Sequence, residues 1–291
     1  MDRRSLAGAA AVLLALAAAY YDILAGLVRQ WNTDDNYSHG FVVLPLALWF
    51  AWERRAKLRV LPRRPSSAGL IVILLSLGLL TVGVLGAELF LSRISLLGVV
   101  AGLVLFLAGP AHLRTLAFPI AFLLLMVPLP AIIFNRIAFP LQLVASQAGS
   151  TALDWAGVPV LREGNVLVLA TTKLEVAEAC SGIRSLVSLL TLAIVLGQFS
   201  LRTPPGRVAL ALAAVPVAIA ANASRVAGTG LAAHFWSPEV AEGFFHSFSG
   251  WIVFAAAFAV LLAVQRVIQR IETRPTRTTL GTPAIAPAGE A

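Results

Sequence analysis

Long apolar runs recur along this chain, and they constrain the fold more than any other feature. The longest match the ~20 residues with which a helix crosses a ~30 Å hydrocarbon layer. The runs lie at about 6–28, 41–52, 68–87, 94–109, 116–134, 182–199, 208–233 and 247–265. Hydrophobic residues make up 59% of the 291 residues and charged residues only 12%, which excludes an ordinary soluble domain. The sequence therefore predicts an all-α polytopic membrane protein with about eight transmembrane helices.

Basic residues divide unevenly between the two sides of the membrane that alternating spans define. If the N-terminus is cytoplasmic, fifteen lysines and arginines lie on the inner side and six lie on the outer side. Arg93 is one of the six, and Arg225 lies within a span. The positive-inside rule then favours an even number of spans with both termini cytoplasmic. The net charge of +8 thus describes orientation and attraction to anionic lipid, and we expect no nucleic-acid partner.

The two ends of the chain carry separate expectations. The first run follows Arg3 and Arg4 and has small residues at 17–19, which fits a signal peptide, but its continuation to Val28 favours an uncleaved anchor. Residues 1–272 are predicted to form the transmembrane domain. Residues 273–291 are rich in Thr, Pro and Ala and are predicted to be a disordered cytoplasmic tail.

One segment between the fifth and sixth runs departs from the spanning pattern. Residues 139–156 fit an interfacial helix, and residues 158–176 are extended in character. Apolar arms on both sides of Gly164-Asn165 predict a β-hairpin. This small extracytoplasmic helix and hairpin lead directly to Cys180, the one cysteine of the chain.

Polar residues near the predicted outer ends of the last three spans indicate nucleophilic chemistry. Cys180 begins the sixth span, where the helix dipole favours a thiolate, and Arg184 one turn later adds positive charge. Arg225 lies within the seventh span with Asn222 on the same helical face, and His246 begins the eighth. Each residue also has a structural interpretation: a buried cysteine, a snorkelling arginine, a hydrogen-bonded interfacial histidine.

Together these residue types suggest acyl transfer through a thioester. Imidazole can take the thiol proton and later protonate a leaving amine, and a guanidinium can stabilise the oxyanion. The four histidines show no paired ligand spacing, so no metal site is expected. The chain has no Gly-rich nucleotide loop, so no cofactor is expected.

These polar blocks occur in an order and spacing that resemble the exosortase family, eight-span membrane proteins proposed to process substrates with a PEP-CTERM sorting signal. The resemblance covers most of the chain. Its blocks are Asn36-Tyr37-Ser38-His39-Gly40-Phe41, Phe118-Pro119, Pro128-Leu129-Pro130, Val176-Ala177-Glu178-Ala179-Cys180-Ser181-Gly182-Ile183-Arg184-Ser185, Asn222-Ala223-Ser224-Arg225 and His246.

The resemblance implies a cysteine protease or transpeptidase with Cys180 as nucleophile, His246 as general acid and base, and Arg225 stabilising the oxyanion or substrate. It implies exported substrate proteins that end in a Pro-Glu-Pro-like motif, a hydrophobic span and a basic tail. It also implies a bacterial inner-membrane location, a site at the periplasmic face, and a link to exopolysaccharide and extracellular matrix. The further candidates for substrate binding are Asn222, Arg184, His39 and Glu178.

Two other functions fit parts of the pattern. A transporter or polysaccharide-assembly component would bind an anion with Arg225 and have an incidental Cys180, and a membrane scaffold would need neither. Lys173, Glu175 and Glu178 either bind the sorting signal or belong to a cap over the site. Asp22, near the outer end of the first span, is a secondary candidate for the site.

Overall fold

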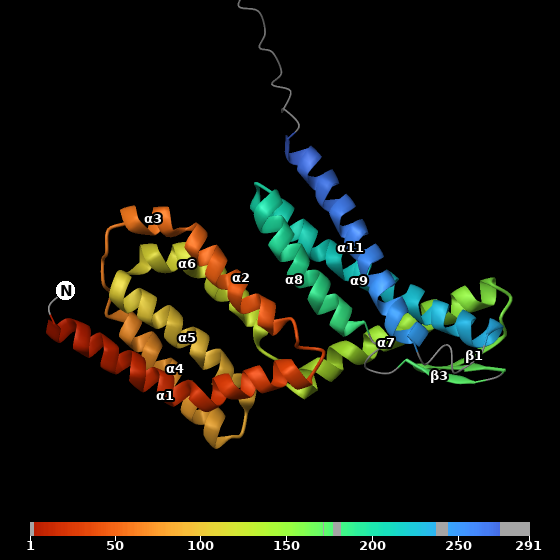
Figure 1. Ribbon diagram of the computed structural model, residues 1–291, viewed down its shortest axis with the longest axis horizontal. Coiled ribbons are helices and arrows are strands. Elements are labelled where there is room, and N and C mark those ends of the chain that lie inside the picture. The colour runs from red at the N-terminus through yellow and green to blue at the C-terminus, as the bar shows by residue number, and fades with distance from the viewer. Residues whose placement is uncertain (1–2, 171, 177–181, 237–243, 274–291) are drawn as a thin grey trace, which may run out of the picture.

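The computed structural model describes residues 3–170, 172–176, 182–236 and 244–273, with side chains from residue 14 on and without those of 244–249 (Figure 1). Helices predominate, and residues 160–175 form a small three-stranded sheet. The elements are α1 (Arg3–Thr33), α2 (Gly40–Glu53), α3 (Arg55–Val60), α4 (Ala68–Leu85), α5 (Leu89–Ala108), α6 (Pro110–Phe122), the 3-10 helix η1 (Leu123–Met126), α7 (Ala131–Trp155), β1 (Val160–Glu163), β2 (Val166–Leu169), β3 (Lys173–Glu175), α8 (Ile183–Ser200), α9 (Pro204–Phe235) and α11 (Phe244–Thr273).

Five helices in the described part are long and apolar enough to cross a membrane: α4, α5, α8, α9 and α11 from Gly250 onward. A sixth span is added if α6, η1 and α7, which are bent by 78° at a short break, cross the membrane as one unit. Helix α2 is apolar but has only 14 residues. The all-α polytopic membrane fold is confirmed, and the number of eight spans stays a prediction.

The predicted span at 116–134 and the interfacial helix predicted at 139–156 both have the wrong bounds. After η1 the backbone becomes extended at Val127, with φ −88° and ψ 116°. Pro128 and Pro130 explain the break, because proline lacks an N–H donor and disfavours helical backbone at the residue before it. Helix α7 then begins at Ala131 and continues through Pro140 to residue 155, so the expected interfacial helix is the second half of a longer one.

Helix α5 begins at Leu89 and not at the predicted residue 94. Glu88 is its N-cap, and the Glu88 carboxylate accepts a hydrogen bond from the backbone N–H of Phe90 at 3.2 Å. Arg93, expected in a loop outside the membrane, therefore lies inside α5 and is only 5% exposed. The expected loop position of Arg93 is wrong because a capping carboxylate starts the helix before the charged residue, and its expected place near the outer side stays a prediction.

The predicted β-hairpin is confirmed. Strands β1 and β2 are antiparallel, with Val160 opposite Leu169 and Glu163 opposite Val166. Gly164 lies in the turn with φ 66°, a conformation that glycine adopts without a steric penalty. Strand β3 pairs with β2 as a third strand that the sequence pattern did not separate from the extended segment. The sheet packs on α7 and α9 through a shared buried cluster.

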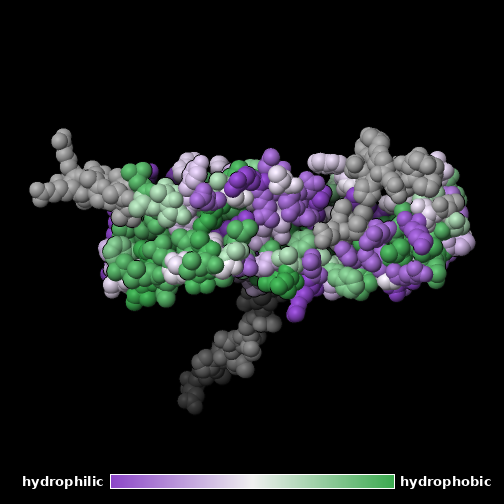
Figure 2. All heavy atoms as spheres, turned by 90° about the horizontal axis from the view of Figure 1, so that it is seen from below, coloured by the Kyte–Doolittle hydropathy of each residue, from purple (hydrophilic) through white to green (hydrophobic). Residues whose placement is uncertain are grey.

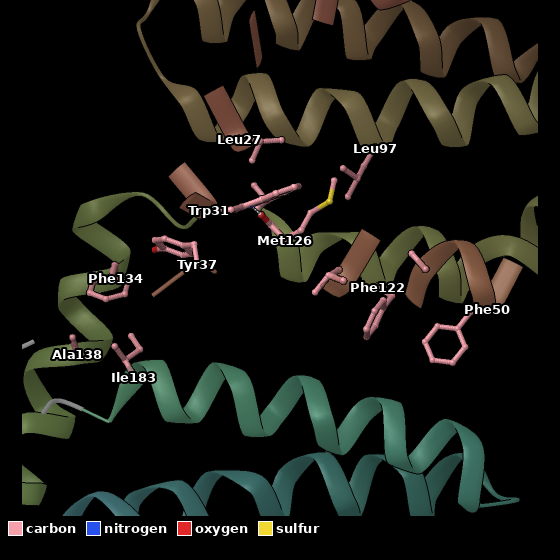
Figure 3. Close-up of a cluster of buried hydrophobic side chains, with 13 residues drawn as sticks. Leu27, Trp31, Tyr37, Phe50, Leu97, Phe122, Met126, Phe134, Ala138 and Ile183 are labelled. Atoms are coloured by element: carbon pink, nitrogen blue, oxygen red, sulfur yellow. Dashed lines mark hydrogen bonds between the residues drawn. The ribbon is translucent and has the colours of Figure 1, made fainter. Parts of the chain in front are cut away.

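The helices form two groups, α1 to α6 on one side and α8, α9 and α11 on the other, with α7 leading from the first to the second (Figure 1). The first group has a buried cluster centred on Trp31, whose indole N–H donates to the carbonyl of Met126 at 3.0 Å (Figure 3). Ile183, the first residue of α8, packs against the same cluster near Ala138 (Figure 3). The start of α8 is therefore held by both groups.

The loops of the first group meet at two opposite ends. At one end, residues 34, 36–37, 87–88 and 128–131 line one cavity. At the other end, the backbone N–H of Arg64 donates to the carbonyl of Ala108 at 3.2 Å. These ends correspond to the predicted outer and inner sides. Figure 2 shows apolar residues over much of the surface around α1 to α6, as a lipid-facing surface requires, and hydrophilic residues toward the middle and the sheet.

Candidate active site

The seven predicted site residues differ in how much the structure describes of them. His246 lies in the first turn of α11, and its side chain is outside the described part. Cys180 and Glu178 lie outside the described residues. The remaining four have described side chains: Arg225, Asn222, Arg184 and His39. The site is therefore built from the residues that flank positions 180 and 246.

Helix α9 carries Asn222 and Arg225 on one face, since residues three apart are neighbours on a helix surface. The helix starts at a Thr203 cap, whose hydroxyl accepts from the backbone N–H of Gly206 at 3.2 Å, with proline in the first turn. Asn222 is 5% exposed and Arg225 is half-buried. Both polar groups thus lie between packed helices.

Asn222 packs against Gly182, the N-cap residue of α8. The expectation that Cys180 begins this helix is wrong, because Gly182 has a left-handed backbone and the helix starts after it, at Ile183. A Cβ on Gly182 would lie 2.9 Å from Cβ and Cγ of Asn222 and 3.1 Å from its Nδ2. Gly182 also has φ 76°, so both the backbone conformation and the lack of space require glycine. Because Gly182 follows Cys180 by two residues, this contact holds the chain beside the cysteine against the Asn222 turn of α9.

Arg225 packs against Gly250 of α11. A Cβ on Gly250 would lie 3.6 Å from Cζ and from Nη2 of Arg225. Positions 246 and 250 lie one helical turn apart on the same face of α11. The guanidinium of Arg225 therefore contacts α11 one turn beyond His246, while Asn222 on the same face of α9 contacts the start of α8.

The three helices are held together by a buried cluster that includes Leu189 of α8, Leu210 of α9 and Leu261 of α11, each 0% exposed. Small residues such as Ala214 and Ala257 in this cluster let the helix backbones approach closely. The three helices that carry or follow the predicted site residues thus pack side by side, as the sequence predicted. Contact among the side chains of positions 180, 225 and 246 stays a prediction.

Arg184 directs its charge toward the turn between α1 and α2. Its Nη1 lies 3.2 Å from Oδ2 of Asp35, and its Nε donates to Oδ1 of Asn36 at 3.5 Å. The Arg184 and Asp35 side chains are 41% and 78% exposed, so water screens the ion pair. Arg184 therefore fixes the first turn of α8 against that turn, and Asp35 offsets the charge that the sequence suggested for a thiolate.

His39 joins α2 to η1. Its Nε2 lies 2.9 Å from the carbonyl oxygen of Leu125, and since a carbonyl only accepts, Nε2 carries the proton. Burial lowers the pKa of His39 below its ordinary value of 6.5, so the ring is neutral at pH 7. This geometry describes a structural role, and contact of His39 with substrate stays a prediction. No cluster of three or more metal-ligating residues occurs in the part of the chain described.

The sequence reasoning missed a cavity of about 530 Å³ at the end of the first helix group. Its polar lining comes from α1, the turn that follows α1, the cap and first turns of α5, and the start of α7: Gln30, Asp34, Asn36, Tyr37, Glu88, Arg93 and Asn135. A second cavity of about 230 Å³ shares Arg93 and is also lined by Asp22, which places Asp22 near Arg93. The available signal was an arginine inside an apolar run, five residues after a glutamate that starts a helix.

A family model described as transmembrane exosortase matches residues 31–263. The chain belongs to this family. The matched region contains Gly182, Asn222, Arg225 and Gly250, which form the contacts described above. Exosortases are in general membrane sorting transpeptidases of the cysteine type. No curated protein and no solved structure matches the chain.

Proposed function

We propose that this exosortase cleaves the C-terminal sorting signal of exported proteins, of the PEP-CTERM type, through a thioester on Cys180. The observation that supports this proposal is the face of α9 on which Asn222 contacts Gly182, next to the cysteine, and Arg225 contacts Gly250, one turn from His246. The site faces the periplasm of a bacterial inner membrane, and both termini are cytoplasmic. The cleaved proteins serve exopolysaccharide and extracellular-matrix production.

In this proposal His246 takes the proton of Cys180, and the thiolate attacks the carbonyl carbon of the scissile peptide bond. The S–C bond forms as the carbonyl becomes a tetrahedral oxyanion. When the oxyanion collapses, the C–N bond breaks and the leaving amine takes the proton from the imidazolium. An amine acceptor or water then gives a proton to His246, attacks the thioester and releases the Cys180 thiolate.

Arg225 stabilises the oxyanion. Its guanidinium is half-buried between α9 and α11, where a charge-assisted hydrogen bond is stronger than in water. A planar guanidinium also offers two parallel N–H donors to one oxygen-bearing group. Asn222 has a positioning role: its buried side chain packs against Gly182, the N-cap residue of α8, and so fixes the backbone two residues after Cys180.

The test is co-expression with a reporter protein that ends in a Pro-Glu-Pro motif, an apolar span and a basic tail. Mass spectrometry of the reporter should show a new C-terminus with the wild type and an intact tail with Cys180→Ala. Cys180→Ser is the matched variant, since it keeps the size of the side chain and removes the thiol.

Since Cys180 is the one cysteine, a hydroxylamine-sensitive adduct on the chain would report the thioester directly. An intact reporter tail with the wild type, or equal processing by wild type and Cys180→Ala, would contradict the proposal. A transporter or polysaccharide-assembly role predicts instead that Cys180→Ser leaves function unchanged.

A further inference from the structure

Arg93 is a buried cation that forms no ion pair with any residue the structure describes. It lies in α5, is 5% exposed, and lines both outer cavities, of about 530 and 230 Å³. Among the residues that the structure describes, Arg93 donates no hydrogen bond and forms no ion pair within 4.0 Å. An arginine at this depth is costly unless a ligand or water compensates its charge.

The two acidic residues of the larger cavity have other hydrogen-bond partners. Oδ1 of Asp34 accepts from the backbone N–H of Asn36 at 2.9 Å, and Oε1 of Glu88 accepts from the backbone N–H of Phe90 at 3.2 Å. Both carboxylates are thus used to hold a turn and a helix cap. Glu88 attracts Arg93 across the cavity, and Asp22 lines the smaller cavity with it, but neither carboxylate forms an ion pair with Arg93 within 4.0 Å among the described residues. The Arg93 guanidinium therefore keeps its N–H donors available to the contents of the cavity.

The cavity is also connected to the candidate active site. Asn36 lines the cavity and accepts the hydrogen bond from Arg184, four residues after Cys180. The break between η1 and α7 contributes Pro128, Leu129 and Pro130 to the wall. A chain segment in the cavity would therefore meet an apolar wall, one buried cation and a turn bonded to the start of α8.

We propose that this cavity binds a side-chain carboxylate of the polypeptide substrate, with Arg93 as its ligand. The inference rests on the proposed function for the identity of the polypeptide. A volume of about 530 Å³ lies within the range of small-ligand sites. A single carboxylate matches the guanidinium fork, whereas a phosphate dianion would meet the like charges of Asp34 and Glu88.

The test measures binding and needs no cleavage. The full chain carrying Cys180→Ala, in nanodiscs of neutral lipid, is titrated with a capped peptide whose one charged residue is a glutamate between two prolines. Replacing that glutamate by glutamine should weaken binding about tenfold, the loss expected for one charge-assisted pair. Adding Arg93→Gln should weaken glutamate-peptide binding by a similar factor and abolish discrimination between the peptides. Arg136→Gln, which removes an exposed arginine of α7 outside the cavity lining, is the matched control and should keep the discrimination.

Equal binding of the two peptides by the Cys180→Ala chain overturns the inference. This comparison changes only the peptide, so it does not depend on whether an Arg93 variant folds. Unaltered discrimination in Arg93→Gln overturns it as well, and Arg93→Lys, which keeps the charge, replaces that variant if it does not fold. If Arg93→Gln changes binding only in nanodiscs that contain anionic lipid, and the peptide glutamate has no effect, the site binds a lipid headgroup. This result also overturns the inference. Cys180-dependent cleavage without peptide discrimination refutes this inference alone, and discrimination without cleavage refutes the proposed function alone.

Discussion

Gly182→Ala should damage both the stability and the activity of this exosortase, because Gly182 is the contact between the start of α8 and Asn222. Two costs add at this position. The residue has φ 76°, and an alanine in the left-handed region costs about 1–2 kcal/mol. The new Cβ would also lie 2.9 Å from Cβ and Cγ of Asn222, and overpacking of this kind costs about 1–3 kcal/mol.

Gly164→Ala is the matched control for the backbone cost. Gly164 has φ 66° in the hairpin turn, and nothing lies within 4 Å of the Cβ it would gain. Its substitution should therefore cost about 1–2 kcal/mol, against about 2–5 kcal/mol for Gly182→Ala. The difference isolates the contact with Asn222.

The free energy of unfolding of both variants is measured in the same detergent, and reporter processing is measured in cells. Gly182→Ala should lower the processing rate more than Gly164→Ala, because Asn222 and the start of α8 must move apart. Alkylation of the single cysteine should change in rate for Gly182→Ala and stay unchanged for Gly164→Ala. Equal destabilisation and equal processing in the two variants would refute the role given to this contact.

Three other predictions follow from named contacts. Arg225→Lys should fold and slow reporter processing about 100-fold, because an ammonium does not reproduce the guanidinium fork, and a wild-type rate would contradict the oxyanion role. Burial lowers the pKa of His39 below 6.5, so the stability that the neutral ring contributes is complete above pH 6.5 and is lost as the pH falls through the lowered pKa. The free energy of unfolding, measured against pH, should fall over this range in the wild type and should not fall there in His39→Gln. Trp31→Phe should cost about 1–3 kcal/mol in unfolding free energy, because the buried Met126 carbonyl loses its donor, and no change would exclude that contribution.

The sequence was informative where local rules dominate. Gly164-Asn165 between apolar arms predicted the hairpin that β1 and β2 form, since turn chemistry fixes the register of neighbouring strands. It was least informative at helix ends. Glu88 caps α5 early and Pro128 and Pro130 break the predicted fifth span, because a single side-chain cap or missing N–H outweighs average hydropathy there.

The sequence by itself determined that the chain is a polytopic helical membrane protein, since its apolar runs leave the backbone no other way to satisfy its hydrogen bonds in lipid. It also named Arg225 as a candidate, because a charged group within a span is rare and costly, and Cys180 and His246, because they lie near the predicted outer ends of neighbouring spans. Only the tertiary structure brought Asn222 against Gly182 and Arg225 against Gly250, and only it buried Arg93 in a cavity wall. Such contacts join residues far apart in the chain, and helix packing, which local periodicity does not encode, decides which of them meet.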